Sequence, residues 1–474
     1  MPTRPNILFI MSDDHAAHAM SCYGSRINHT PNLDRIASEG MRLDRCFCTN
    51  SICTPSRATI LTGTYNHVNG VTTLDTPMDA GLQTFPKLLR ESGYQTAVFG
   101  KWHLGEHKSF EFCPTGFDDW AVLPGQGFYH NPEFIFKGPR GPVQRTVMGY
   151  VTDLITDFCL DWLQNRDRER PFCLLYHHKA PHRHWNPDEK HAAMYLNEDI
   201  PEPDTLYDDY SNRASAAAAA EMRVGVHMTQ LDMKCEVPKN IPEREMRKWA
   251  YQRYIKDYLR VIASVDDNVG RVLDYLDADG LTENTIVIYC SDQGFFLGDH
   301  GWYDKRFMYE ESLKMPFVVR YPKEIEPGSV SDDMVLNVDF APLFLDFAGL
   351  PIPKGMQGRS FRPVLGGETP PDWRDSMYYR YWMHKAHHNV YAHYGLRTKR
   401  FKLIYYYSDG LHQMGASDEK YEPEWELFDL ERDPAEMNNV YADPAYAETV
   451  RELKAELHRQ QAAVGDARYE KDVD

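Results

Sequence analysis

Two pairs of oxygen-bearing side chains, far apart along the chain, could together bind one hard cation. Asp13 and Asp14 directly follow one short apolar run, and Asp292 and Gln293 directly follow another. In open α/β sheets the functional crevice lies beyond the carboxyl ends of the strands, so the two pairs would meet there if both runs are strands of one sheet. Carboxylate and amide oxygens suit Ca²⁺, with Mg²⁺ or Mn²⁺ as alternatives, better than zinc. Either pair alone is equally compatible with capping a following loop or helix.

A cysteine near a predicted helix start is the second feature that could do chemistry. Cys53 lies two residues before Pro55, which suits the first turn of a helix, and Arg57 lies one helical turn after the cysteine. The positive end of the helix dipole would then lie at Cys53, and Arg57 could face the same point. This arrangement would stabilise an anion, or an oxygen that gains negative charge during a reaction.

The segment around Cys53 resembles a known signature. Residues 53–63, which begin Cys-Thr-Pro-Ser-Arg, are similar to the first signature of type I sulfatases, in the alkaline-phosphatase-like superfamily. Residues 93–103 resemble the second signature, although Phe99 departs from it, since a smaller or aliphatic residue is usual before the glycine. Further matches follow in the family's order over nearly the whole chain, at 6–8, 13–14, 176–182, 291–294, 304–306, 338–343 and 427–434. Their number and order argue against coincidence.

The resemblance implies a sulfate ester hydrolase that depends on formylglycine. In this family a maturation enzyme oxidises the signature cysteine to formylglycine, whose hydrated aldehyde is the nucleophile. By the same resemblance, Cys53 would become formylglycine and would bind the metal ion together with Asp13, Asp14, Asp292 and Gln293. A bound Ca²⁺ would then polarise the sulfate oxygens as a Lewis acid.

The remaining catalytic roles are also implied by the resemblance. Lys101 and Lys305 would hold the sulfate, and Arg57 would hold the diol and the carboxylates that bind the metal. His103 would take a proton from the second diol hydroxyl, so that the sulfated enzyme releases sulfate. His182 would protonate the leaving oxygen, which suits an imidazole that titrates near neutral pH.

The substrate implied by the resemblance is a small sulfated sugar or a short oligosaccharide. Residues 291–312 and 394–398 look most like bacterial carbohydrate sulfatases of the N-acetylglucosamine-6-sulfatase and heparan-type branch. A phosphonate monoester or phosphodiester hydrolase, or a promiscuous arylsulfatase, of the same superfamily is an alternative. Asp14 weighs against the phosphonate branch, which often has glutamine at that position. A catalytically silent sugar-binding relative is the alternative from another class, and it applies if Cys53 stays a thiol.

Five further histidines are candidates for substrate contact: His178, His300, His384, His387 and His388. His178 could instead point into the core, and His300 could be an ordinary turn residue. The last three lie in an aromatic-rich segment, which we interpret as a loop that reaches back over the mouth of the pocket to contact a sugar ring. Strand packing with solvated histidines is the alternative, and no spacing in this segment matches a zinc site.

The elements that must position these residues alternate between short β-rich runs and longer helical runs. This pattern predicts an α/β fold with a large, mostly parallel (mixed) sheet between helices. The expected strands are 6–11, 95–99, 172–176, 285–290 and 316–320, and the expected helices are 32–39, 55–62, 85–92, 150–164 and 249–277. We expect a catalytic domain over 1–365, with 183–248 as an insertion near the active-site mouth. A smaller α+β domain is expected over 366–474, with strands at 377–382 and 393–407 and a helix near 445–461.

Composition limits the partners of this chain. Among its 474 residues, 52 Lys and Arg face 70 Asp and Glu, which gives a formal net charge of −18. A nucleic-acid partner is excluded because phosphate binding requires a basic surface, and the charge favours short substrates over long polysulfated chains. No apolar run is long enough for a membrane helix and no secretory signal is visible, so we expect no membrane partner and a cytoplasmic location. The scattered cysteines suit reduced thiols, and an oligomer is compatible with the sequence.

Overall fold

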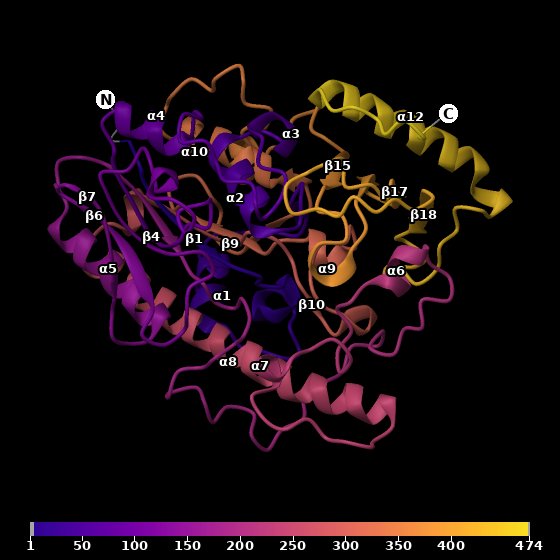
Figure 1. The fold of residues 1–474 in the computed structure, drawn as a ribbon. Coiled ribbons are helices and arrows are strands. Elements are labelled where there is room, and N and C mark those ends of the chain that lie inside the picture. Colours follow the sequence, from indigo (N-terminus) through magenta and orange to yellow (C-terminus); the bar gives the residue numbers. More distant parts are fainter. Residues whose placement is uncertain (1–3, 473–474) are drawn as a thin grey trace.

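A ten-stranded sheet runs through the middle of the protein in the computed structural model, which describes residues 4–472 (Figure 1). In order across the sheet, the strands are β13 (Ser329–Ser331), β2 (Met41–Leu43), β12 (Phe317–Arg320), β9 (Thr285–Ser291), β1 (Asn6–Ser12), β8 (Phe172–His177), β4 (Gln95–Lys101), β5 (Asp119–Leu123), β6 (Glu133–Gly138) and β7 (Gly141–Thr146). The strands from β9 to β5 are parallel, and antiparallel β12 and β6 flank them. The predicted mixed, mostly parallel sheet between helices is confirmed.

Helices cover both faces of this sheet because its central strands are apolar on both sides. In β1, Leu8 and Ile10 join the core on the side of α1 (Pro31–Ser38), α5 (Val151–Asn165) and α8 (Glu243–Ala278). Ile7 and Phe9 join the core on the other side, which is covered by α2 (Cys53–Thr62), α4 (Phe85–Glu91) and α10 (Phe340–Phe347). Figure 1 shows these layers, with α2, α4 and α10 above the sheet and α1 and α8 below it.

The strands and helices predicted for the large domain are all present, and their ends differ most at α8. This helix begins at Glu243 and not at residue 249, so it starts inside the segment interpreted as an insertion. The rest of that segment is mostly irregular and contains α6 (Ser215–Ala219), on the alanine run, and α7 (Gln230–Met233). It packs against the loop after β10 (Phe296–Leu297), where the ring of Tyr210 stacks on Trp302 at 5.2 Å.

Short elements connect these layers. They are β3 (Cys46–Phe47), β11 (Tyr303–Asp304), β14 (Val335–Leu336), α3 (Asn66–Asn69), α9 (Glu310–Leu313) and α11 (Arg362–Leu365). Strand β3 pairs with β14, and β10 pairs with β11 in a small hairpin that delivers the loop at residues 305–309. Within residues 4–472, no helix combines the length and the apolar character needed to cross a membrane.

A second, antiparallel sheet follows near the C-terminus. It consists of β15 (Ser376–Tyr381), β16 (His393–Thr398), β17 (Phe401–Tyr406) and β18 (Glu424–Asp429), and α12 (Ala447–Val464) packs on it. The prediction of one strand over 393–407 is wrong, because the chain turns between β16 and β17. The hydroxyl of Thr398 makes this turn by accepting a hydrogen bond from the Phe401 backbone amide at 2.8 Å. Such a turn lacks the glycine or asparagine that marks most hairpins.

The apolar core continues from the large sheet into the small one. The ring of Phe307 packs on Tyr406, and the ring of Tyr309 packs on Phe428 at 5.4 Å. One buried cluster includes Leu8 of the central strand together with Phe428 of the small sheet. The small sheet and α12 lie within residues 366–474, but their stability depends on contacts with the rest of the chain, so a boundary at residue 365 stays a prediction.

Gly100 allows the end of β4 to lie directly against β8. Its φ is +106°, and a Cβ added to it would lie 1.8 Å from the carbonyl oxygen of His177. Only glycine tolerates such an approach without displacing one of the two strands. Because Lys101 is the next residue, the same contact fixes where β4 presents its last side chain.

Replacing Gly100 by alanine should therefore destabilise the protein strongly, because β4 must move away from β8. We expect a loss of at least about 2 kcal/mol in the free energy of unfolding, measured by denaturant titration. Gly280→Ala is the matched control, since Gly280 has φ +68° but, among residues 4–472, no atom within 4 Å of an added Cβ. It should lose only the backbone cost of about 1 kcal/mol. Equal losses in the two variants would contradict the close approach.

Candidate active site

The carboxyl ends of β1 and β9 bring the two acidic pairs together. The strands pair in parallel with Ser12 opposite Ser291, so Asp13 and Asp292 leave the sheet side by side. Carboxylate oxygens of Asp13, Asp14 and Asp292 lie within 4.8 Å of one another, and the three side chains are at most 1% exposed. We call these three residues the carboxylate cluster. Burying like charges this close is unfavourable unless cations lie nearby.

Cys53 is the first residue of α2 and lies beside the carboxylate cluster. Its side chain is buried, and its Sγ lies 4.0 Å from the Nζ of Lys305. The Sγ also lies within 4.8 Å of atoms of Asp13 and His182. Burial raises the pKa of the Cys53 thiol even though Lys305 acts to lower it. The thiol is therefore neutral at neutral pH and a weak nucleophile as it stands.

Arg57 lies one turn further along α2 and ties the helix to two strand ends. Its Nε donates to Asp292 Oδ2 at 3.0 Å, just beyond β9, and its Nη1 donates to the carbonyl oxygen of Lys101 at 2.8 Å, at the end of β4. The side chain is 2% exposed. This arginine therefore neutralises one carboxylate and fixes the position of the helix that carries Cys53.

Two buried lysines supply the remaining positive charge. Lys101 forms an ion pair with Asp13, and Lys305, which follows β11, forms one with Asp14. Burial raises the pKa of the Asp14 carboxyl to about 6, although Lys305 acts to lower it. Burial also lowers the pKa of Lys101 well below its ordinary value. Lys101 additionally contacts the side-chain oxygen of Gln126, a residue that the sequence analysis did not select and that only its two flanking glycines mark.

His103 approaches the site just after β4. Its Nδ1 lies 3.4 Å from the hydroxyl of Thr54, the neighbour of Cys53, and the same hydroxyl donates to the His103 carbonyl oxygen at 2.9 Å. Burial lowers the pKa of His103 well below its ordinary value, and the charges of Lys101 and Arg57 lower it further. The imidazole is therefore neutral near pH 7, which suits a group that accepts a proton.

His182 approaches from the segment after β8, and one of its ring nitrogens is hydrogen-bonded to the backbone. Its Nδ1 lies 3.0 Å from the carbonyl oxygen of Arg183, and because a carbonyl only accepts, this nitrogen carries the hydrogen. Its Nε2 lies 3.8 Å from Asp14 Oδ2 and faces the carboxylate cluster. Burial lowers the pKa of His182 well below its ordinary value, and the charges of Lys101, Lys305 and Lys179 lower it further.

The donor set at the cluster fits a hard divalent cation. Among residues 4–472, Asp14 Oδ2 and Gln293 Oε1 are enclosed and accept no hydrogen bond. The amide nitrogen of Gln293 donates to Asp14 Oδ1 at 2.5 Å, which holds the amide against the carboxylates. Enclosed oxygens without partners cost free energy that coordination to a cation would offset. An oxygen-rich set of this kind suits Ca²⁺ or Mg²⁺ rather than zinc.

The structure thus brings together every residue predicted for catalysis and metal binding: Asp13, Asp14, Cys53, Arg57, Lys101, His103, His182, Asp292, Gln293 and Lys305. Several side chains reach the site from strained backbone. Positive φ angles occur at Asp14 (71°), His103 (56°), Asp304 (79°) and Arg306 (99°). Such angles are unfavourable for residues other than glycine and tend to occur at functional sites.

Lys179 belongs to the same site but was not selected from the sequence. Its side chain is buried, and burial lowers its pKa to about 7, although Asp14 and Cys53 act to raise it. It is the one lysine of the segment 176–182, which matched the family pattern but in which only histidines were chosen as candidate site residues. A charged residue between a buried strand and a candidate catalytic histidine was the available signal.

Two of the C-terminal histidines reach the edge of the site. His388 Nε2 lies 3.2 Å from Asp304 Oδ2, next to Lys305, and its carbonyl oxygen accepts a hydrogen bond from the Glu221 amide. His387 is exposed, and its pKa is lowered by partial burial and by the charge of Arg306. The interpretation of the segment as a loop that covers a pocket mouth and contacts a sugar ring stays a prediction.

The other three candidate histidines are packed inside the protein, which corrects their assignment as substrate contacts. His178 points, like Tyr176, toward the face of the sheet that α5 and α8 cover, and its ring lies 4.3 Å from that of Tyr176. His384 is fully buried and accepts a hydrogen bond from the Ala392 amide at 3.1 Å. His300 lies between two carboxylates. Sequence could not separate these cases because the residue type is the same in each.

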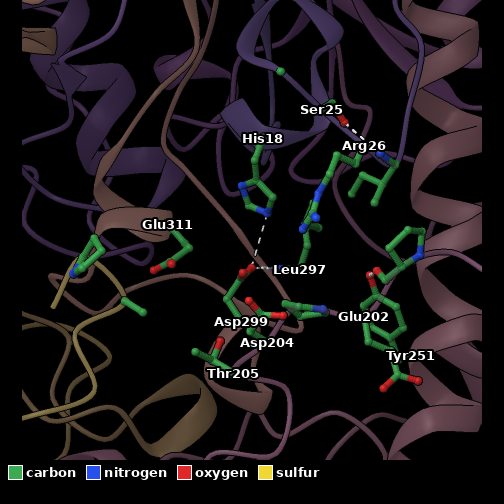
Figure 2. Close-up of a pocket in the computed structure, with 16 residues that line it drawn as sticks. His18, Ser25, Arg26, Glu202, Asp204, Thr205, Tyr251, Leu297, Asp299 and Glu311 are labelled. Carbon is green, nitrogen blue, oxygen red and sulfur yellow. Dashed lines mark hydrogen bonds and ion pairs between the residues drawn. The ribbon is translucent and has the colours of Figure 1, made fainter.

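His300 lies in a buried network of charged side chains. Its Nδ1 lies 3.3 Å from Asp208 and its Nε2 lies 3.7 Å from Glu311. These contacts outweigh burial and raise the pKa of His300 to about 9. A cavity of about 390 Å³ lies beside this network. Figure 2 shows that His18 pairs there with Asp299 near Glu311. Among the described residues, the lining of this cavity includes no member of the carboxylate cluster.

Comparison with known families assigns the chain. Residues 5–350 match the family model described as Sulfatase, and residues 298–463 match the model described as N-sulphoglucosamine sulphohydrolase, C-terminal. Because the first match covers most of the chain, the protein belongs to the sulfatase family and is a sulfuric ester hydrolase.

Individual relatives agree with this assignment. The chain is 44% identical to an N-acetylglucosamine-6-O-sulfatase of Bacteroides thetaiotaomicron over an alignment of 508 positions. The alignment covers 98% of this chain and 87% of that protein. A solved structure described as a complex with its substrate D-glucosamine-2-N,6-O-disulfate superposes with a TM-score of 0.90 at 43% identity, over 99% of this chain and all of that one. A phosphonate monoester hydrolase from Silicibacter pomeroyi shares the fold, with a TM-score of 0.75 at 22% identity over 99% of this chain and all of that one.

The charge network around His300 should make the free energy of unfolding fall as the pH rises into the alkaline range. Its pKa is raised from 6.5 to about 9 in the folded protein, so its contribution is complete below pH 6.5 and disappears as the pH rises through 9. His300→Gln should therefore cost about 3 kcal/mol in the free energy of unfolding at pH 6.5 and much less at pH 10.

The measurement is denaturant unfolding of both proteins at a series of pH values. His412→Gln is the control, since His412 also faces an aspartate but is 86% exposed, and it should change stability by less than about 0.5 kcal/mol. A cost for His300→Gln that does not vary with pH would contradict the charged state assigned to this histidine.

Proposed function

We propose that the protein removes the 6-O-sulfate from glucosamine derivatives, as single sugars or short oligosaccharides. The proposed enzyme uses formylglycine at position 53 and a bound divalent metal ion, Ca²⁺ in the first instance. The observation that carries the proposal is the meeting of Cys53, the carboxylate cluster and two lysines at the carboxyl ends of β1, β9 and β4. The substrate class is supported by 44% identity over nearly the whole chain to an N-acetylglucosamine-6-O-sulfatase.

The unmodified thiol is a poor candidate for the nucleophile. Burial keeps Cys53 neutral, and a sulfate ester formed on an ordinary thiol or hydroxyl would need a second attack at sulfur. Formylglycine supplies a hydrated aldehyde, which can release sulfate by cleavage of a carbon–oxygen bond. Its position at the start of α2 places it at the positive end of the helix dipole, where an anion is favoured.

The charges of the site leave two cations for the substrate. A divalent ion together with Arg57 would balance the three negative charges of the carboxylate cluster. The ammonium groups of Lys101 and Lys305, which now pair with Asp13 and Asp14, would then be available to hold a sulfate group. Such fixed positive charges in an enclosed site stabilise the negative charge that develops as the bond to the leaving oxygen lengthens.

The two histidines divide the proton transfers. His182 has its Nδ1 committed to the Arg183 carbonyl, so Nε2 of the protonated imidazole is the atom that would give a proton to the leaving sugar oxygen. The negative charge of a bound sulfate ester would oppose the lysines that lower the pKa of this histidine. His103 lies beside the neighbour of Cys53 and is neutral, which suits it to take a proton from the hydroxyl of the modified residue.

Polar groups near Lys305 are candidates for contact with a short sugar substrate. Asp304 and Arg306 flank Lys305, and His387 and His388 approach them from the C-terminal domain. We propose that these polar groups contact the hydroxyls of a sugar ring. The net charge of −18 opposes long polysulfated chains, although at physiological salt each exposed charge acts over only about 8 Å.

Sulfate release from N-acetylglucosamine-6-sulfate should depend on modification of residue 53. Protein co-expressed with a formylglycine-generating enzyme should show the aldehyde mass in the peptide that contains residue 53 and should release sulfate, measured by ion chromatography. Cys53→Ala should reduce the rate by at least about a thousandfold. Full activity of a preparation whose residue 53 is a thiol would overturn the mechanism, and faster hydrolysis of an aryl phosphonate than of any sulfate ester would overturn the reaction.

Calcium should stabilise the protein through the carboxylate cluster. Protein treated with a chelator and then given Ca²⁺ at one hundred times the dissociation constant should gain about 2.7 kcal/mol in the free energy of unfolding. Asp292→Asn should abolish most of this gain, because it removes a charged ligand. Asp274→Asn is the control, since Asp274 is 76% exposed and pairs with Arg35. A gain that is unchanged in Asp292→Asn would place the ion elsewhere.

A further inference from the structure

One backbone carbonyl next to the active site accepts two side-chain hydrogen bonds. The carbonyl oxygen of Arg183 lies 3.0 Å from His182 Nδ1 and accepts from Lys179 Nζ at 3.2 Å. Both side chains belong to the short segment that follows β8, so this oxygen joins a lysine and the histidine three residues later. A single carbonyl oxygen therefore links Lys179 to Nδ1 of His182.

Lys179 is enclosed without the partner that a buried cation usually has. Its side chain is 3% exposed, and among residues 4–472 it forms no ion pair with a carboxylate, in contrast to Lys101 and Lys305. Its ammonium group lies 4.7 Å from the centre of the Tyr129 ring. Enclosing an ammonium group in this way costs free energy that an apolar side chain of similar size would avoid. The contacts of Lys179 must therefore offset this cost.

The aromatic neighbour of Lys179 is itself bonded to the same histidine. The hydroxyl of Tyr129 donates to the His182 carbonyl oxygen at 2.6 Å. Lys179 thus lies between the Tyr129 ring and the Arg183 carbonyl, and each of these groups bonds to His182, one at its backbone and the other at its imidazole. Moving the ammonium group would disturb both supports of the histidine together.

We propose that Lys179 is a positioning residue that holds His182 in the orientation needed to protonate the leaving oxygen. By donating to the Arg183 carbonyl, Lys179 fixes the oxygen that keeps the hydrogen on Nδ1 and aims Nε2 at the carboxylate cluster. The inference rests on the proton-donor role assigned to His182 above.

Protonation of the leaving oxygen matters most when the leaving group is a poor one. A sugar alkoxide needs a proton as the sulfur–oxygen bond breaks, whereas a nitrophenolate leaves readily without one. A residue that acts through His182 should therefore matter for a sugar sulfate and hardly matter for an activated aryl sulfate. A residue that binds sulfate, or that merely supports the fold, should affect both substrates equally.

The test compares two substrates on the formylglycine-containing enzyme. Lys179→Met should lower kcat for N-acetylglucosamine-6-sulfate by about tenfold to a hundredfold, which reaches only the lower end of the effect expected for complete loss of general acid catalysis. For 4-nitrophenyl sulfate, kcat should change by less than about threefold, and KM for both substrates should change little. Loss of the same factor on both substrates, or no loss on the sugar sulfate, would overturn the proposal.

His182→Ala separates failure of the inference from failure of the proposed function. It should also lose rate selectively on the sugar sulfate, and Lys179→Met in the His182→Ala background should cause little further loss. If His182→Ala loses rate equally on both substrates, the proton-donor role fails and the inference fails with it. If His182→Ala is selective but Lys179→Met is not, the inference alone fails.

Two further variants control for folding and for charge. Lys234 also donates to a carbonyl of this region, that of Trp185 at 3.0 Å, but does not contact His182, so Lys234→Met should leave the ratio of the two rates unchanged. Lys179→Gln keeps a donor to the Arg183 carbonyl without the charge and should retain much of the rate on the sugar sulfate. A glutamine variant that is as impaired as Lys179→Met would overturn a role through this hydrogen bond.

Discussion

Three carboxylates buried within 4.8 Å of one another are the constraint around which this protein is organised. The parallel pairing of β1 with β9 forces Asp13 and Asp292 together, and the low dielectric of the interior makes their repulsion strong. The fold answers with positive charge from three separate elements. Arg57 comes from α2, Lys101 from the end of β4 and Lys305 from the loop after β11. Two of these cations, Lys101 and Lys305, are the ones proposed above to hold a sulfate group, so the balance of charge in the fold would also prepare the site for an anion.

Bringing these groups together has a cost in the backbone. The side chains of Asp14, His103, Asp304 and Arg306 reach the site from left-handed φ angles that only glycine adopts freely. Gly100 supplies a close approach of β4 to β8 that no other residue permits. These features are tolerated because the surrounding sheet and helices are well packed and hold the strained residues in place. Precise placement of charge at the strand ends therefore depends on the rigidity of the core beneath them.

The histidines of this chain show how environment divides one residue type among different tasks. His182 has one nitrogen committed to a carbonyl and the other aimed at the carboxylate cluster. His300 lies between Asp208 and Glu311 and is held in its charged form. His178 is packed against Tyr176, and its ring makes no hydrogen bond to any residue from 4 to 472. Only the first of these geometries suits proton transfer to a substrate. Lys179 extends the same lesson, since its role follows from the carbonyl that it shares with His182.

The sequence alone determined the alternation of strands and helices, the acidic pairs at two strand ends and the helix start at Cys53, because these depend on local patterns of burial and on short spacings. The turn between β16 and β17 was not predicted from the sequence, because a threonine hydroxyl makes that turn in place of the usual glycine or asparagine. The beginning of α8 and the places of Gln126 and Lys179 in the site were not predicted either. Only the tertiary structure decided which histidines face the carboxylate cluster and which are enclosed, because that depends on contacts between segments far apart in the chain. Neither composition nor spacing records such contacts.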